Sequence, residues 1–229
     1  MCRVLTHGLA QTPLTSPLLV MNKSLHKDAV RSFKVIQRIM GDRDRDRPVG
    51  VRHAESSSSL HLAASSSSNT LLEEERWLLG EGVTHGEMRD EIYCQVIKQL
   101  SGNTNTYVSS SIWLSSPLNN RMHLSESTFR GWQLLCVLLV TFPPSKNFEP
   151  YVRSFMQQRT TQAAGRVDIM AKYCLHRLDA IAKKGPRGKA PTIAEIESAS
   201  VSVTSCTFRV LLTSLNRTPR STLRHLENP

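Results

Sequence analysis

The chain has 229 residues, enough for one domain with a substantial core and polar tails. Hydrophobic residues make up 39% of it and the net charge is +10, which indicates a folded protein that favours acidic partners. No apolar run reaches the ~18–20 residues of a membrane helix, and the first twenty residues lack the uninterrupted apolar core of a signal peptide, so we expect a cytoplasmic protein without a membrane span.

The first expected helix covers residues 27–41. Apolar residues recur there at helical spacing, Asp28 can cap the start, and Gly41 supplies a left-handed stop. Residues 1–24, ahead of it, are expected to be irregular. After it, alternating charges and two runs of four serines cannot bury enough apolar surface to order the chain. We therefore predict a disordered insertion over about residues 42–69.

A second helix is expected from Thr70. Thr70 and Glu73 have the spacing of a capping box, in which each residue satisfies a free N–H of the other. Gly80 and Gly82 are expected to close this helix, because glycine is the residue that most often ends one.

The stretch Thr84–Leu100 concentrates residue types used by metal sites and acid–base catalysts: His85, Glu87, Asp90, Glu91 and Cys94. The motifs of zinc deaminases and zinc proteases are incomplete or absent, and His85 and Cys94 would point to different faces of a helix. The spacing of Thr84 and Glu87 instead predicts structural caps at a helix start, with Cys94 buried in an apolar stripe. Arg89 is placed to pair with a carboxylate on a neighbouring helix.

A second insertion is predicted at about residues 102–125, where polar residues and asparagines interrupt the pattern. Four helices are expected beyond it: residues 129–142, 145–158, 166–185 and 191–199. Regularity is lost from about Ser200, so residues 200–229 are expected to form an irregular tail. Neither strand pairs nor a fixed repeat emerges, and the predicted fold is all-α: a single compact helical bundle with long disordered insertions.

Three cysteines lie within these helical patterns without C-x-x-C spacing, and we expect them to be reduced and buried: Cys94, Cys136 and Cys174. The sequence has no nucleophile elbow and no glycine-rich phosphate loop after a strand. We therefore predict no catalytic residue, no metal and no cofactor.

Residues 166–189 carry seven basic and two acidic side chains, half of the chain's net charge. The predicted partner-binding basic patch consists of Arg166, Lys172, Arg177, Lys183, Lys184, Arg187 and Lys189. The alternative is a solvated helix face with a basic last turn, which the helix dipole favours. Nucleic acid is not expected as the partner, because few exposed aromatic residues accompany the charges.

Four stretches, in this order along the chain, resemble the myosin tail homology 4 (MyTH4) domain over roughly residues 25–199: "AVRSFKVIQRIMGD", "LLGEGVTHGEMRDEIYCQVIKQLSGN", "FRGWQLLCVLLVTFPPSKNFEPYVRSFM" and "GPRGKAPTIAEIESA". The resemblance implies an all-helical module without enzymatic activity. Such modules occur in tails of unconventional myosins, often before a FERM domain, and are associated with cytoskeletal binding, including basic patches that contact microtubules. The amino-acid sequence of the last two stretches is most similar to the branch of the family found in a Rho GTPase-activating protein.

Two functions follow as hypotheses. The first is a non-catalytic, cytoskeleton-associated adaptor that binds microtubules or another acidic cytoskeletal protein through the basic patch. The second is a fragment or isoform of a Rho GTPase-activating protein that lacks its GTPase-activating (GAP) domain, since only about 30 residues follow the resemblance. A neighbouring GAP or FERM domain in a longer isoform is a further candidate partner.

Overall fold

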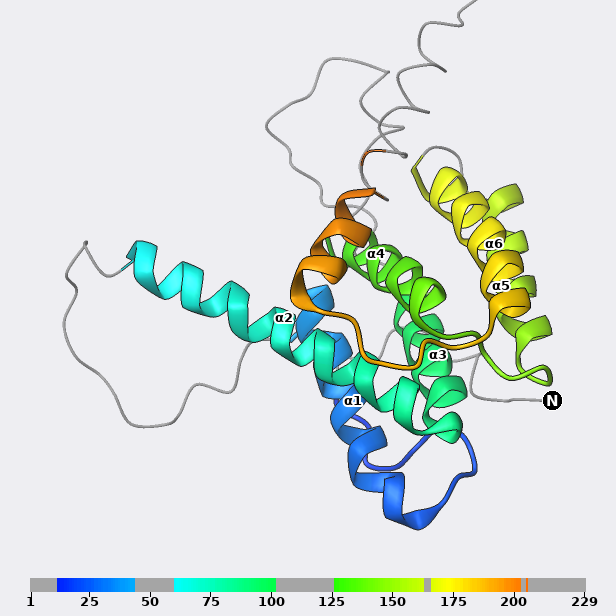
Figure 1. Ribbon diagram of the computed structural model, residues 1–229, viewed down its shortest axis with the longest axis horizontal. Coiled ribbons are helices and arrows are strands. Elements are labelled where there is room, and N and C mark those ends of the chain that lie inside the picture. The colour runs from blue at the N-terminus through cyan, green and yellow to red at the C-terminus, as the bar shows by residue number, and fades with distance from the viewer. Residues whose placement is uncertain (1–11, 44–59, 102–125, 163–165, 203–204, 206–229) are drawn as a thin grey trace, which may run out of the picture.

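The computed structural model describes residues 12–43, 60–101, 126–162, 166–202 and 205 (Figure 1). Its helices are η2 (Lys23–Leu25), α1 (His26–Met40), α2 (Leu60–Thr84), α3 (Gly86–Leu100), α4 (Glu126–Thr141), α5 (Glu149–Gln162) and α6 (Arg166–Lys184). Residues 193–202 are also helical. The described part of the chain contains no strand, which confirms the all-α prediction. None of its helices is long and apolar enough to cross a bilayer.

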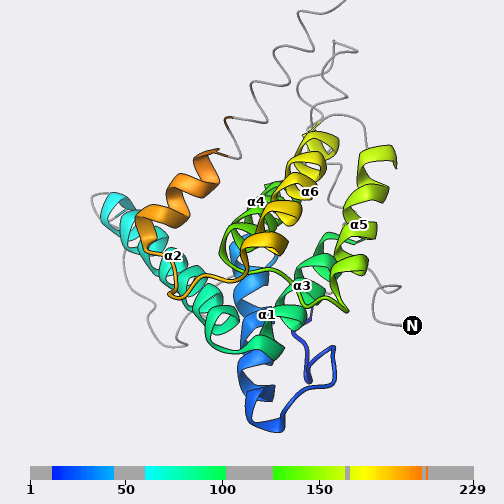
Figure 2. The same cartoon turned by 45° about the vertical axis from the view of Figure 1, so that its right-hand side comes forward.

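Helix α4 occupies the middle of the bundle. It contacts α1, α2, α3 and α6, while α5 packs on α6 and α3. Figures 1 and 2 show α5 and α6 side by side on one flank and α2 on the other. The central position of α4 follows from its apolar sequence, since its largest side chain, Trp132, is 2% exposed.

The ends of α1 and α6 lie where the sequence predicts them. Gly41 has φ 80°, and its N–H and that of Asp42 bond back to the last turn of α1. Gly185 follows α6 with φ 82°. Both are left-handed positions that glycine adopts without a Cβ penalty. The start of α1 differs, because Asp28 lies inside the first turn and makes no cap.

Helix α2 departs most from expectation. It begins at Leu60, so residues 60–69 are helical although they fall within the predicted disordered insertion. Leucine and alanine favour helix there, and extending a helix whose later turns are already docked avoids a new nucleation step. Figure 1 shows this first part of α2 projecting beyond the other helices. Residues 44–59 of the first insertion, and the whole second insertion, lie outside the described residues.

Gly82 does not end α2 as predicted. The helix continues to Thr84, and a Cβ built on Gly82 would lie 2.2 Å from the ring of Phe142. Phe142 is fully buried, so its ring cannot move aside. The glycine therefore permits close contact between α2 and the end of α4 rather than a turn.

Ordered structure extends a few residues beyond both ends of the predicted domain, residues 25–199. Leu18, Leu19 and Met21 pack against the core, so the folded unit starts before residue 25. At the other end, helical structure continues to residue 202, beyond the predicted limit at Ala199. The tail from residue 206 onward lies outside the described residues.

The cysteine prediction is confirmed for the three described cysteines, which are all free and buried. Cys136 of α4 and Cys174 of α6 face each other with their Sγ atoms 3.1 Å apart. Burial raises the pKa of the Cys174 thiol well above its ordinary value, so this cysteine stays protonated and behaves as a small apolar residue.

Candidate functional site

The predicted cap at the start of α3 is wrong. Thr84 is the last residue of α2, and the N-cap of α3 is His85, which has an extended backbone and makes no capping hydrogen bond with its side chain. An N-cap residue must have non-helical backbone angles, and Thr84 does not have them because α2 runs through it. The partner predicted for Thr84, Glu87, bonds elsewhere.

The carboxylate of Glu91 on α3 accepts three hydrogen bonds. Its Oε1 and Oε2 accept hydrogen bonds from the backbone N–H groups of Leu18 and Leu19, each at 2.8 Å. The amide of Gln95 adds a third, at 2.7 Å. Burial raises the pKa of the Glu91 carboxyl, and these hydrogen bonds oppose that rise. The carboxylate thus fastens the N-terminal segment to the bundle.

Glu87 and Asp90 bind backbone groups in the same way. Glu87 accepts from the N–H of Asn22 at 2.8 Å. Asp90 accepts from both the N–H and the hydroxyl of Ser145, at 2.8 and 2.6 Å, in the loop between α4 and α5. The acidic side chains of α3 therefore act as structural acceptors for segments that lie far away in sequence.

Arg89 forms no ion pair with a carboxylate among the described residues, contrary to expectation. Its Nε donates to the carbonyl of Gly82 at 2.7 Å, and its Nη2 donates to that of Val83 at 3.3 Å. These carbonyls belong to the last turn of α2, where helical partners run out. Arg89, in the first turns of α3, thus supplies hydrogen-bond donors to carbonyl groups at the end of α2.

These bonds occupy the acidic side chains of α3 with structural partners. Cys94 is fully buried, as predicted, and so are the apolar residues of its stripe. Within the described residues, no three His, Cys, Asp or Glu side chains converge as metal ligands.

The basic patch predicted for residues 166–189 divides into paired and unpaired side chains. Lys172 lies 3.0 Å from Asp168 on its own helix, and Arg187 lies 2.6 Å from Glu195 in the following helical segment. The second acid of α6, Asp179, is bound by Arg153 of α5 at 2.8 Å. Both acids of α6 are therefore paired with a basic side chain, although Arg153 is shared between Asp179 and Glu149 of α5.

Lys183, Lys184 and Lys189 are exposed, and none of them forms an ion pair within the described part of the chain. We call these three residues the lysine surface. Lys183 and Lys184 end α6, and Lys189 lies in the loop that follows. The side chain of Arg166 lies outside the described residues.

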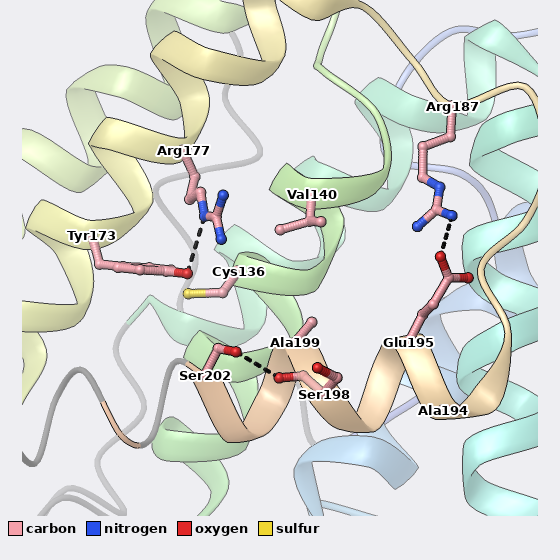
Figure 3. A pocket seen from close by; sticks show the side chains of 10 residues that line it. All are labelled: Cys136, Val140, Tyr173, Arg177, Arg187, Ala194, Glu195, Ser198, Ala199 and Ser202. Carbon is pink, nitrogen blue, oxygen red and sulfur yellow. Dashed lines mark hydrogen bonds and ion pairs between the residues drawn. The ribbon is translucent and has the colours of Figure 1, made fainter.

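Arg177 faces a groove between α4, α6 and residues 193–202, with a volume of about 410 Å³ (Figure 3). Its Nε donates to the Tyr173 hydroxyl at 3.0 Å. The groove is lined by Cys136, Val140, Tyr173, Arg177, Arg187, Ala194, Glu195, Ser198, Ala199 and Ser202. We call it the arginine groove.

Tyr173 and Glu195 also belong to this site and were not predicted from the sequence, although both carry a sequence signal. Tyr173 precedes Arg177 by four residues, the spacing that puts side chains together on one helix face. Thr192 and Glu195 form a capping box, with Thr192 N–H donating to Glu195 at 2.8 Å. Arg187 and the Thr192 N–H lower the pKa of the Glu195 carboxyl, which is therefore ionised.

A model of one protein family matches more than half of the chain: the MyTH4 domain, over residues 76–115 and 116–198. Among curated relatives, the chain is 31% identical over 127 residues to myosin-VIIa of Drosophila melanogaster, which covers 56% of this chain and 5% of that protein. It is 27% identical over 191 residues to human unconventional myosin-XVB, and this match covers 82% of this chain and 5% of that protein. The chain thus spans about one twentieth of the length of these relatives.

Among solved structures, the chain is similar to the human myosin 7b C-terminal MyTH4-FERM domain in complex with the harmonin-a PDZ3 domain. The TM-score is 0.59 at 26% identity, covering 84% of this chain and 31% of that one. A Dictyostelium discoideum myosin VII MyTH4-FERM structure has a TM-score of 0.62 at 20% identity, a likeness of fold alone.

Proposed function

The chain belongs to the MyTH4 domain family, and from this we propose that it is a non-catalytic adaptor module of the cytoplasmic cytoskeleton. The partner we propose is an acidic polymer, the microtubule, bound through the lysine surface at the end of α6. One related MyTH4-FERM unit, that of human myosin 7b, is solved in complex with a protein partner. That complex supports a binding role.

The observation that carries the proposal is the lack of acidic partners for the lysine surface. The neighbouring acids Asp168, Asp179 and Glu195 are each held by another basic side chain. Three exposed cations therefore remain available at the end of α6 and in the loop that follows. Such a surface attracts an acidic polymer at low ionic strength, and added salt screens the attraction.

Cosedimentation of the full chain with microtubules tests this proposal. We expect binding at low salt, weaker binding at raised salt, and a clear loss of binding in the variant with Lys183→Glu and Lys184→Glu. The matched control is Lys23→Glu with Lys27→Glu, which changes two exposed lysines, one in η2 and one in the first turn of α1, by the same total charge. Absence of binding at low salt, or equal loss in both double variants, contradicts a specific role of the α6 end.

We further propose that this MyTH4 unit extends over residues 25–199 with the preceding segment docked on it, and belongs to the branch found in a Rho GTPase-activating protein. The amino-acid sequence of residues 129–156 and 185–199 supports assignment to that branch. Sequencing of longer transcripts of the gene tests it. A reading frame that continues into a GAP domain supports the proposal, whereas continuation into a myosin-type FERM domain contradicts it.

A further inference from the structure

The arginine groove contains one more positive charge than the protein neutralises. Two guanidinium groups, of Arg177 and Arg187, line it together with one carboxylate, that of Glu195. Glu195 is occupied by Arg187 at 2.6 Å and by the backbone N–H of Thr192 at 2.8 Å. The uncompensated charge is therefore that of Arg177.

Arg177 is half-buried, and its position is held by Tyr173. The Nε atom donates to the Tyr173 hydroxyl, and the guanidinium carbon lies 5.3 Å from the centre of the Tyr173 ring. Figure 3 shows the terminal nitrogens of Arg177 turned away from this bond, toward the space above Cys136. No carboxylate within the described part of the chain pairs with Arg177.

The Tyr173 hydroxyl completes a site for a carboxylate. Its oxygen accepts from Arg177, so its own hydrogen remains free to be donated. A carboxylate in the groove would receive N–H donors from Arg177 and an O–H donor from Tyr173. Hydrogen bonds between a cation and a carboxylate are among the strongest in proteins, because both partners are charged.

The remaining lining residues are small, and they include both apolar side chains and the hydroxyls of Ser198 and Ser202. Val140 of α4 and Ala194 and Ala199 of the last helical segment line the groove beside the polar groups. The volume of about 410 Å³ is near the lower end of the roughly 300–1,000 Å³ typical of binding clefts, which is room for a few residues of an extended segment. The loop that closes one end is fixed, because the Arg187 N–H donates to the Thr141 carbonyl at 2.9 Å.

We propose that the arginine groove binds a short acidic peptide segment of a protein partner, with one Asp or Glu carboxylate held by Arg177 and Tyr173. A single uncompensated charge matches a single carboxylate. A phosphomonoester carries about two negative charges at pH 7, more than this single cation balances, and nucleic acid or a phospholipid surface needs a wider array of cations than this groove offers. This site is separate from the lysine surface and does not depend on microtubule binding.

Selection from a random peptide library displayed on phage, against the immobilised full chain, tests the proposal. We expect the enriched peptides to share one acidic position beside small apolar residues. Fluorescence anisotropy with a labelled synthetic copy then measures the affinity. Replacing the acidic residue of the peptide by its amide should weaken binding by about tenfold or more, since a charge-assisted contact is lost.

The protein variants distinguish the groove from the lysine surface. Arg177→Gln should weaken peptide binding by about tenfold or more, whereas the variant with Lys183→Glu and Lys184→Glu should leave it within about threefold. Ser198→Trp, at an exposed position that lines the groove, should block binding without touching Arg177. Melting temperatures of all variants show whether each one folds.

Three outcomes would overturn the proposal. One is a selection that enriches no peptide or only peptides without an acidic residue. Another is equal binding by wild type, Arg177→Gln and Ser198→Trp. A third is self-association of the chain that Arg177→Gln abolishes, which would assign the groove to a second copy.

Loss of microtubule binding in the variant with Lys183→Glu and Lys184→Glu, with peptide binding retained, would support two separate binding sites.

Discussion

The start of α3 and the end of α6 both carry neighbouring like charges, and they use them in opposite ways. At α3, Glu87, Asp90 and Glu91 each accept hydrogen bonds from backbone groups of other segments. At α6, Lys183 and Lys184 extend into solvent without an acidic partner within the described residues. The difference teaches that a charged cluster indicates function only when the fold leaves it unpaired.

Sequence separation explains why the two regions look alike before folding. The acidic acceptors on α3 and their backbone donors are 55 to 73 positions apart, so no local pattern reveals these bonds. The ion pairs around α6 are mostly closer, as for Lys172 with Asp168 four residues away. Only the packing of the segment before α1 and of the α4–α5 loop shows that the acids of α3 are occupied.

The largest expected effect tests the structural role of α3. Glu91→Ala should lower the free energy of unfolding by about 2–4 kcal/mol, because the N–H groups of Leu18 and Leu19 lose their acceptors in a partly buried place. Chemical denaturation measures the change. Glu91→Gln, which keeps one side-chain carbonyl, should cost less. A loss as small as that of an exposed glutamate, such as Glu73→Ala, would remove the contrast between the two regions.

Glu75 of α2 sharpens the comparison, because it is a buried carboxyl without the donors that Glu91 has. It is 8% exposed, and burial raises its pKa to about 7. The folded state therefore binds a proton more tightly than the unfolded state, so this group makes stability fall as the pH rises from about 4.5 to about 7. The nearest basic side chain lining the same cavity, Arg130, is paired with Glu126.

Glu75→Gln should consequently raise the free energy of unfolding at pH 8 by about 1–3 kcal/mol relative to its effect near pH 4.5. Denaturation of both proteins across this pH range measures the difference, in which the titration of all other groups cancels. A difference between the two proteins that stays the same at all pH values would contradict the raised pKa of Glu75.

The smallest expected effect belongs to the lysine surface. The variant with Lys183→Ala and Lys184→Ala should change the free energy of unfolding by no more than about 0.5 kcal/mol, because these exposed side chains stabilise only the end of the α6 dipole. Thermal and chemical denaturation measure it. A destabilisation comparable to that of Glu91→Ala would mean that these lysines are structural and would weaken the case for a partner.

Much of the fold was predictable from local patterns. Apolar spacing located α1, α3, α4, α5 and α6, and Gly41 and Gly185 marked two helix ends. Burial of Cys94 followed from its place in an apolar stripe. These features depend on residues within a few turns of one another, which is why the sequence is sufficient to find them.

The candidate sites were predictable only in part. The sequence located the basic cluster after residue 166 but did not separate Lys183, Lys184 and Lys189 from the basic residues that have partners. It also identified Thr84 and Glu87 as caps. That interpretation was wrong, because α2 continues through Thr84 and the Glu87 carboxylate bonds to Asn22.

The sequence by itself determined the helical class, the order of the main helices and the family, since periodicity, helix stops and the MyTH4 motifs are properties of neighbouring residues. The tertiary structure alone decided which charges are paired, why Gly82 lies against Phe142, and that Arg177 and Tyr173 face a groove with residues 193–202. The physical reason is the same in each case. A hydrogen bond, a close contact or a groove requires two segments to meet, and the packing of the bundle decides which segments do.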